Sequence, residues 1–205
     1  MPSLDLPLSG ILEGRIRPPQ EFVTRCATEL ERRGWTREIA GEARFDKAAR
    51  AWAYALANQM GVIVLGPNGT GKTSFADTIT RVQREGGKLW RVSMKDAREA
   101  AYLNRFEFGE YHEQVLREKD VLIDDLGAEC PVNHYGNKFE PALDFILQYL
   151  QRGKGRLYIT TNLCGKAGEA NSLLTRYSAR LDCLREKVIP LVLDGKGVRQ
   201  WLLPL

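Results

Sequence analysis

Eight consecutive residues, Gly66 to Thr73, restrict the possible folds of this 205-residue chain more than any other feature. They read GPNGTGKT and fit the pattern G-x-x-x-x-G-K-[ST]. The apolar segment 62–65 precedes them and is expected to be a buried strand, and segment 72–84 is expected to be a helix. A strand, a glycine-rich loop and a helix in this order are typical of parallel α/β proteins, so the pattern predicts an α/β fold.

The glycine-rich loop is expected to bind a polyphosphate. Its glycines allow the backbone N–H groups from Asn68 to Lys72 to point at one position, where the amino terminus of the helix adds positive partial charge. Lys72 is expected to reach the β and γ phosphates, and the Thr73 hydroxyl to complete the ligand shell of Mg²⁺. A glycine-rich turn that binds no ligand is the alternative. The residues expected to bind the nucleotide are Gly66, Asn68, Gly69, Thr70, Gly71, Lys72, Thr73 and Ser74.

Two acidic residues follow the apolar strand expected at 121–123. The carboxyl end of this strand would direct Asp124 toward the phosphates, where Mg²⁺ needs a hard oxygen ligand. Asp125 is the candidate for polarising the attacking water. Two successive acids after a buried strand are costly to leave unpaired, which favours a functional role over a structural one.

Three further polar residues are candidates for catalysis. Asn162 follows the strand expected at 156–161 and could reach the γ phosphate or the water, although Asn after a strand is often a turn residue. Arg176 and Arg180 lie four residues apart on an expected helix, and hence on one face. An arginine from a neighbouring subunit can stabilise charge on a transferring phosphoryl group. A solvent-facing pair of arginines is the alternative.

The rest of the chain alternates between short apolar runs and amphipathic stretches, as a parallel sheet with crossover helices does. Five strands are expected, at 62–65, 88–93, 121–123, 156–161 and 188–193. Helices are expected at 45–60, 72–84, 94–119, 139–150 and 173–184. A loop containing Pro131 and Gly136 and a short final strand after Gly197 complete the prediction. This alternation predicts a three-layer arrangement with a five-stranded, mainly parallel sheet.

The amino-terminal segment 1–44 is expected to be an extension of the α/β domain at 45–205. Residues 1–19 contain four prolines and are expected to form an extended arm. A short amphipathic helix is expected to follow, from Pro19 to about Gly34. Its apolar stripe either packs on the chain's own domain or docks a partner, and it consists of Phe22, Cys26 and Leu30.

Composition and charge narrow the class of protein. The longest aliphatic runs are too short to span a bilayer and residues 1–10 lack the basic start of a secretory signal, so we expect a cytoplasmic protein. The four cysteines include no CxxC pair and there are two histidines, which predicts reduced thiols and no metal cage. Residues 150–205 carry ten Lys and Arg against four Asp and Glu, and this charge either contacts nucleic-acid phosphates or is a solvated surface.

The segments GPNGTGKT, VLIDDLGAE, YITTNL and TRYSARL, in this order, resemble those of the AAA+ ATPases of the DnaC-type helicase loader and IstB-type transposition helper group. The resemblance covers about residues 42–200. It implies a P-loop NTPase with an AAA+ core that binds ATP and Mg²⁺ through Lys72, Thr73 and Asp124, with Asn162 sensing the γ phosphate. Arg180 is the first choice for the trans-acting arginine finger and Arg176 the second. Only some twelve residues follow the fifth strand, so no helical lid is expected.

The resemblance implies a DNA replication protein, a loader that joins into homo-oligomers through ATP, contacts single-stranded DNA and serves a replicative helicase. An IstB-like helper of a transposase is the nearest alternative. A small-molecule kinase built on the same phosphate loop is an alternative of another class, although no lid-like insertion is apparent. A binding module in which the nucleotide is only structural is the third, and the intact acids Asp124 and Asp125 argue against it.

Overall fold

The computed structural model of the chain describes residues 20–83, 90–93, 120–128, 132–134, 137–139, 146, 149–151, 155–164, 172–177, 184 and 187–195. Three predicted elements lie outside these residues: the arm at 1–19, the helix at 94–119 and the strand after Gly197. Arg180 lies outside them as well.

The main sheet has five parallel strands among the described residues. They are β1 (Gly61–Leu65), β2 (Trp90–Ser93), β3 (Val121–Leu126), β6 (Leu157–Thr161) and β7 (Val188–Val192). Each strand overlaps a predicted one, so the α/β fold with a parallel sheet is confirmed. The order across the sheet is β2-β3-β6-β1-β7.

The strand order brings the predicted functional segments to one edge of the sheet. Strand β6 lies between β1 and β3, and Thr161 at its carboxyl end is in register with Leu65 of β1 and with Leu126 of β3. All five residues of β1 and of β6 are buried, as expected for parallel strands covered on both faces. The carboxyl ends of β1, β6 and β3 therefore lie side by side, where ligands of open α/β sheets bind.

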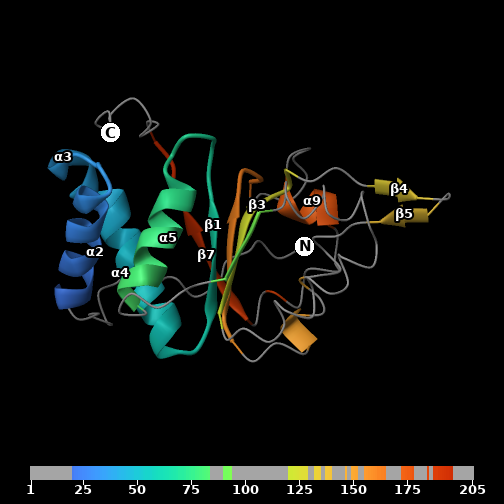
Figure 1. The fold of residues 1–205 in the computed structure, drawn as a ribbon, viewed down its shortest axis with the longest axis horizontal. Coiled ribbons are helices and arrows are strands. Elements are labelled where there is room, and N and C mark those ends of the chain that lie inside the picture. Colours follow the sequence, from blue (N-terminus) through green and yellow to red (C-terminus); the bar gives the residue numbers. More distant parts are fainter. Residues whose placement is uncertain are drawn as a thin grey trace.

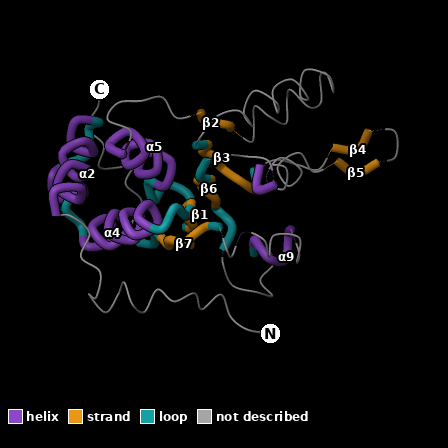
Figure 2. Tube along the Cα trace, turned by 90° about the horizontal axis from the view of Figure 1, so that it is seen from below, coloured by secondary structure: helices purple, strands orange, loops and turns teal. Residues whose placement is uncertain are grey.

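Helices cover the sheet in layers. Helices α4 (Ala43–Ala57) and α5 (Lys72–Gln83) pack on one face, α2 (Gln20–Arg32) packs against them from outside, and α9 (Leu173–Tyr177) lies on the opposite side (Figure 1, Figure 2). The residues that the structure describes include no helical lid. None of the helices described is long and apolar enough to cross a membrane.

Short helix α3 (Arg37–Ala40) was not predicted from the sequence. Thr36 precedes it in an extended conformation, and its hydroxyl accepts a hydrogen bond from the Ile39 N–H at 3.4 Å. A threonine at this position supplies one of the bonds that a helix lacks at its start. Four residues are too few for a helical period to be visible in the sequence.

The apolar stripe of α2 belongs to the core of the protein. Val23, Cys26 and Leu30 are buried in one cluster with Phe45 of α4 and Phe75 of α5, and Phe22 packs against this cluster. Burial raises the pKa of the Cys26 thiol to about 12. The stripe therefore packs on its own chain, which is one of the two alternatives that the sequence leaves open. A domain boundary at residue 44 stays a prediction.

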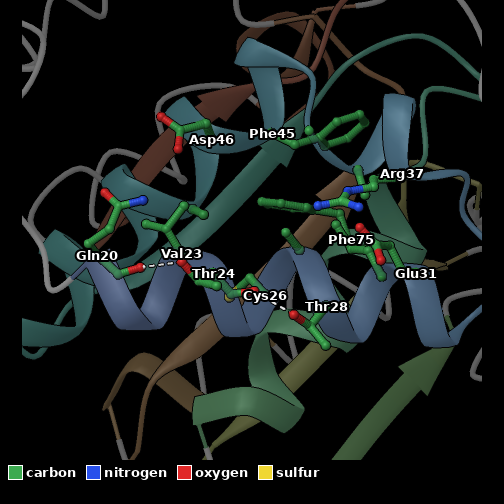
Figure 3. Close-up of a pocket in the computed structure, with 15 residues that line it drawn as sticks. Gln20, Val23, Thr24, Cys26, Thr28, Glu31, Arg37, Phe45, Asp46 and Phe75 are labelled. Carbon is green, nitrogen blue, oxygen red and sulfur yellow. Dashed lines mark hydrogen bonds between the residues drawn. The ribbon is translucent and has the colours of Figure 1, made fainter.

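A pocket of about 520 Å³ lies between α2 and helices α3, α4 and α5 (Figure 3). Its walls combine apolar side chains such as Val23 and Phe45 with polar ones such as Glu31 and Arg37. The phosphate loop does not line it. The Thr24 and Thr28 hydroxyls on α2 donate to main-chain carbonyls four residues earlier in the same helix, at 3.0 Å in both cases.

The loop expected around Pro131 and Gly136 is instead an antiparallel hairpin. Its strands are β4 (Val132–His134) and β5 (Asn137–Phe139), and Val132 pairs with Phe139. The prediction was wrong because proline and glycine were taken as signs of a loop, and strands of three residues are too short to show an alternating pattern. Phe139, expected to begin a helix, ends β5.

Replacing Leu30 with alanine tests whether α2 is part of the core. Leu30 is 1% exposed, so we expect Leu30→Ala to lower the free energy of unfolding by about 2–5 kcal/mol. The exposed Arg25 of the same helix is the control, and Arg25→Ala should change it by less than about 0.5 kcal/mol. Urea unfolding measures both. Equal, small effects would show that α2 is not needed by the core.

Candidate nucleotide-binding site

The glycine-rich loop connects β1 to α5 and needs glycine for its path. Gly66, Gly69 and Gly71 have φ values of +153°, +82° and +89°. A β-carbon at Gly66 would lie 2.0 Å from the carbonyl oxygen of Leu193, which follows β7. Only glycine allows this approach and this conformation together. The predicted strand, loop and helix are confirmed, and α5 begins at Lys72 as expected.

The side chain of Lys72 bonds to the glycine loop and to the residue that follows β6. Its Nζ donates to the carbonyl oxygen of Pro67 at 2.8 Å and to Oδ1 of Asn162 at 2.7 Å. The side chain of Lys72 is buried, and Asn162 directly follows β6. The Thr70 hydroxyl also donates to the Pro67 carbonyl, at 3.0 Å. The structure thus brings Lys72 and Asn162 together, 90 residues apart in the sequence.

Asp124 lies at the centre of the site. Its Oδ1 accepts hydrogen bonds from the Thr73 hydroxyl of α5 at 2.8 Å and from the Thr160 hydroxyl of β6 at 2.7 Å. A hydroxyl and a carboxylate side by side are hard oxygen ligands, which suit Mg²⁺. In the described ranges no three His, Cys, Asp or Glu residues gather as a metal site. Mg²⁺ bound by Thr73 and Asp124 would take its remaining ligands from water and phosphate, as this ion usually does.

Asp125 has an unusual backbone conformation. Its φ is +58°, and the register between β3 and β6 shifts between Ile123 and Leu126. The Asp125 N–H donates to the Thr160 hydroxyl oxygen at 2.9 Å. Asp125 is more exposed than Asp124, although it follows directly in the same strand. An irregular strand end of this kind re-directs a side chain and is frequent next to active sites.

Of the two candidate arginines, Arg176 lies within the described residues. Arg176 is exposed on α9, and its Nη1 donates to the carbonyl oxygen of Gly127 at 2.7 Å. Its guanidinium group also lies 5.7 Å from the ring centroid of Tyr177. Gly127 follows Asp125 by two residues, so Arg176 contacts the acidic segment of its own chain. Arg180 lies outside the described residues.

Sequence reasoning did not identify three residues that support the site. The Thr160 and Thr161 hydroxyls bond to β3, and the Trp35 Nε1–H donates to the Ser74 hydroxyl at 3.1 Å. Arg33, two residues before Trp35, forms an ion pair with Asp77 of α5. Two threonines ending an otherwise apolar strand were a signal for Thr160 and Thr161. Nothing in the local sequence connects Trp35 with Ser74.

A glycine-rich loop after β1, acids at the end of β3 and strand β6 between them define a P-loop type of α/β fold. No family model and no curated protein matches the sequence. Solved structures do match. DnaI has a TM-score of 0.57 at 16% identity, and the match covers 74% of this chain and 86% of that one. The DnaC helicase loader gives 0.52 at 17% identity, with 74% and 91% covered.

A third structure, AMPPCP-bound DnaA from Aquifex aeolicus, has a TM-score of 0.50 at 16% identity, with 74% of this chain and 47% of that chain covered. At such identities the likeness shows the fold. The expected similarity to the fold of DnaC-type AAA+ proteins is therefore confirmed. The roles of individual residues stay predictions.

Replacing Gly66 with alanine tests the packing of the phosphate loop, and Gly34→Ala is the control. Gly34 has φ +86° and no atom within 4 Å of the position that a β-carbon would take, so Gly34→Ala should cost about 1–2 kcal/mol for the left-handed backbone. Gly66→Ala adds a close approach to Leu193 and should cost clearly more. Thermal and urea unfolding compare the two variants. Equal losses would mean that the contact with Leu193 is not tight.

Proposed function

We propose that the chain binds ATP with Mg²⁺ at the carboxyl ends of β1, β6 and β3 and hydrolyses it to ADP and phosphate. One observation carries this proposal. Lys72 and Thr73 begin α5, whereas Asn162 follows β6 and Asp124 belongs to β3. Hydrogen bonds of 2.7 and 2.8 Å join Lys72 to Asn162 and Thr73 to Asp124 beside the glycine loop. A cation, a metal-ligand pair and a polar amide at a helix amino terminus fit a nucleoside triphosphate.

Each residue has a proposed role. The loop from Gly66 to Ser74 binds the phosphates, with Lys72 on the β and γ phosphates. Thr73 and Asp124 hold Mg²⁺, which neutralises phosphate charge when bound. Asp125 polarises the attacking water, and Asn162 senses the γ phosphate. The Nζ of Lys72 already has Asn162 as its neighbour at 2.7 Å, so a phosphate near one of them lies near the other.

We further propose that the protein is a DnaC-like loader of a replicative helicase that works in the cytoplasm. The likeness of its fold to DnaI and to the DnaC helicase loader supports this function. The excess of ten basic over four acidic residues in 150–205 supports a contact with single-stranded DNA. A helper of a transposase would share these features, and a pull-down with helicase and transposase candidates separates the two.

Oligomers bridged by ATP are part of this proposal, with Arg180 as the finger that reaches the site of a neighbouring subunit. The hydrogen bond of Arg176 to Gly127 in its own chain favours Arg180 over Arg176. An arginine of this kind stabilises charge on the transferring phosphoryl group.

Two variants should separate nucleotide binding from hydrolysis. Lys72→Ala removes the cation beside Asn162 and should abolish detectable ATP binding in a titration with a fluorescent nucleotide. Asp125→Asn should bind ATP normally and release phosphate at least about 100-fold more slowly, because general base assistance is lost. Lys47→Ala, at an exposed lysine of α4 that is not part of the loop, is the control. Unchanged phosphate release by Asp125→Asn would remove Asp125 from the mechanism.

A shared site predicts that hydrolysis depends on assembly. Phosphate release per chain should rise with protein concentration and with single-stranded DNA, and Arg180→Ala should reduce it by about 10³-fold or more while ATP still binds. Mixing Arg180→Ala with Asp125→Asn chains should restore hydrolysis, because each lacks what the other supplies. No restoration on mixing would contradict a finger acting in trans.

The same measurements decide between classes of protein. A rate per chain that depends on neither concentration nor DNA would mean a self-contained site. Phosphate transfer that begins only when a metabolite is added would favour a small-molecule kinase. Binding of ATP without any turnover would favour a module in which the nucleotide is structural.

A further inference from the structure

We propose that Thr160 is a positioning residue whose hydroxyl aligns Asp124 and Asp125, so that hydrolysis depends on it more than nucleotide binding does. The inference rests on the proposed ATPase function of the site. Thr160 is fully buried in β6, between β1 and β3, where parallel strands usually carry apolar side chains. A hydroxyl at such a position is costly unless it is hydrogen-bonded, so its partners indicate its purpose.

The two hydrogen bonds of Thr160 have fixed directions. The Asp125 N–H is a donor, so the Thr160 oxygen accepts from it, at 2.9 Å. The single hydrogen of the hydroxyl is then available for Asp124 Oδ1, at 2.7 Å. One side chain thus binds the carboxylate of the first acid and the backbone of the second. No other arrangement satisfies both contacts.

The bond to the Asp125 N–H lies at the irregular part of β3. Asp125 has φ +58°, a conformation that residues other than glycine rarely adopt, and it must be held there by its surroundings. The register of β3 against β6 shifts at this point, between Ile123 and Leu126. Thr160 therefore bonds to the one residue of β3 whose backbone departs from the strand, which is also the candidate for polarising water.

The neighbouring threonine secures the far side of the same irregularity. The Thr161 hydroxyl donates to the Leu126 carbonyl at 2.6 Å and accepts from the Leu163 N–H at 3.1 Å. Thr161 thus bonds only to main-chain atoms in these contacts, whereas Thr160 reaches a carboxylate. The difference predicts that the two residues affect the site differently: Thr161 supports the strand end and Thr160 orients the acids.

The test compares Thr160→Val, which keeps the shape and removes both bonds, with Thr160→Ser, which keeps the hydroxyl. We expect Thr160→Val to lower kcat about 10–100-fold, a range typical when a partner of a metal ligand is lost, with KM for ATP within about threefold. Thr160→Ser should recover most of kcat. The Mg²⁺ concentration for half-maximal hydrolysis should rise in Thr160→Val, because Asp124 is no longer held.

Thr80→Val is the matched control. Thr80 is also a buried threonine, and its hydroxyl bonds within α5, at 2.8 Å to the Ala76 carbonyl. Its urea midpoint should fall by an amount similar to that of Thr160→Val, while its kcat and its Mg²⁺ dependence stay at the values of the unsubstituted protein. If both variants lose kcat in proportion to their stability, the role of Thr160 is structural and the inference is overturned.

Failure of the inference and failure of the proposed function give different results. Normal kcat in Thr160→Val, beside an inactive Asp125→Asn, overturns the positioning role alone. Absence of ATP hydrolysis by the unsubstituted protein overturns the proposed function. The crystal structure of Thr160→Val then decides the inference without activity: Asp125 leaving its positive φ supports it, and an unchanged end of β3 overturns it.

Discussion

The buried carboxylate of Asp124 is the interaction on which the arrangement of the site depends. A carboxylate removed from water needs hydrogen-bond donors, and two hydroxyls provide them, Thr73 from α5 and Thr160 from β6. Satisfying Asp124 therefore requires β3, β6 and the start of α5 to be in place at the same time. Because α5 begins where the glycine loop ends, the position of the loop is tied to the same group. The same packing of β3, β6 and α5 that satisfies Asp124 therefore also sets the geometry of the site.

Much of this arrangement is predictable from the sequence because its signals are local. The strand, glycine loop and helix around Lys72, and the acids after 121–123, each lie within a few residues of one another. Asn162 follows its strand as predicted. The two threonines that end β6 were a local signal, but the bonding partners of Thr160 become apparent only from the strand order, which places β6 beside β3. Hairpin β4–β5 and the four-residue helix α3 were missed because they are too short for a period to show.

Helix α2 shows how an apparent appendage can belong to the core that supports a candidate site. Its stripe is buried against Phe45 and Phe75, and the segment that follows it bonds to α5 through Arg33–Asp77 and Trp35–Ser74. Ser74 directly follows Thr73, so Trp35 bonds to the neighbour of a proposed metal ligand. The amphipathic pattern alone was also compatible with docking a partner, since periodicity shows that a face is apolar and not what covers it.

The contact between Gly66 and Leu193 links the phosphate loop to the last strand of the sheet. The Leu193 N–H donates to the Leu65 carbonyl at 2.8 Å, so the chain after β7 is joined to the residue just before the loop. Arg44 of α4 in turn donates to the carbonyl of Asp194 at 2.6 Å. The segment at 193–194 thus contacts the loop through Leu193 and α4 through Asp194. A displacement of Leu193 toward the loop would meet Gly66 at once, because a β-carbon at Gly66 would already overlap the Leu193 carbonyl.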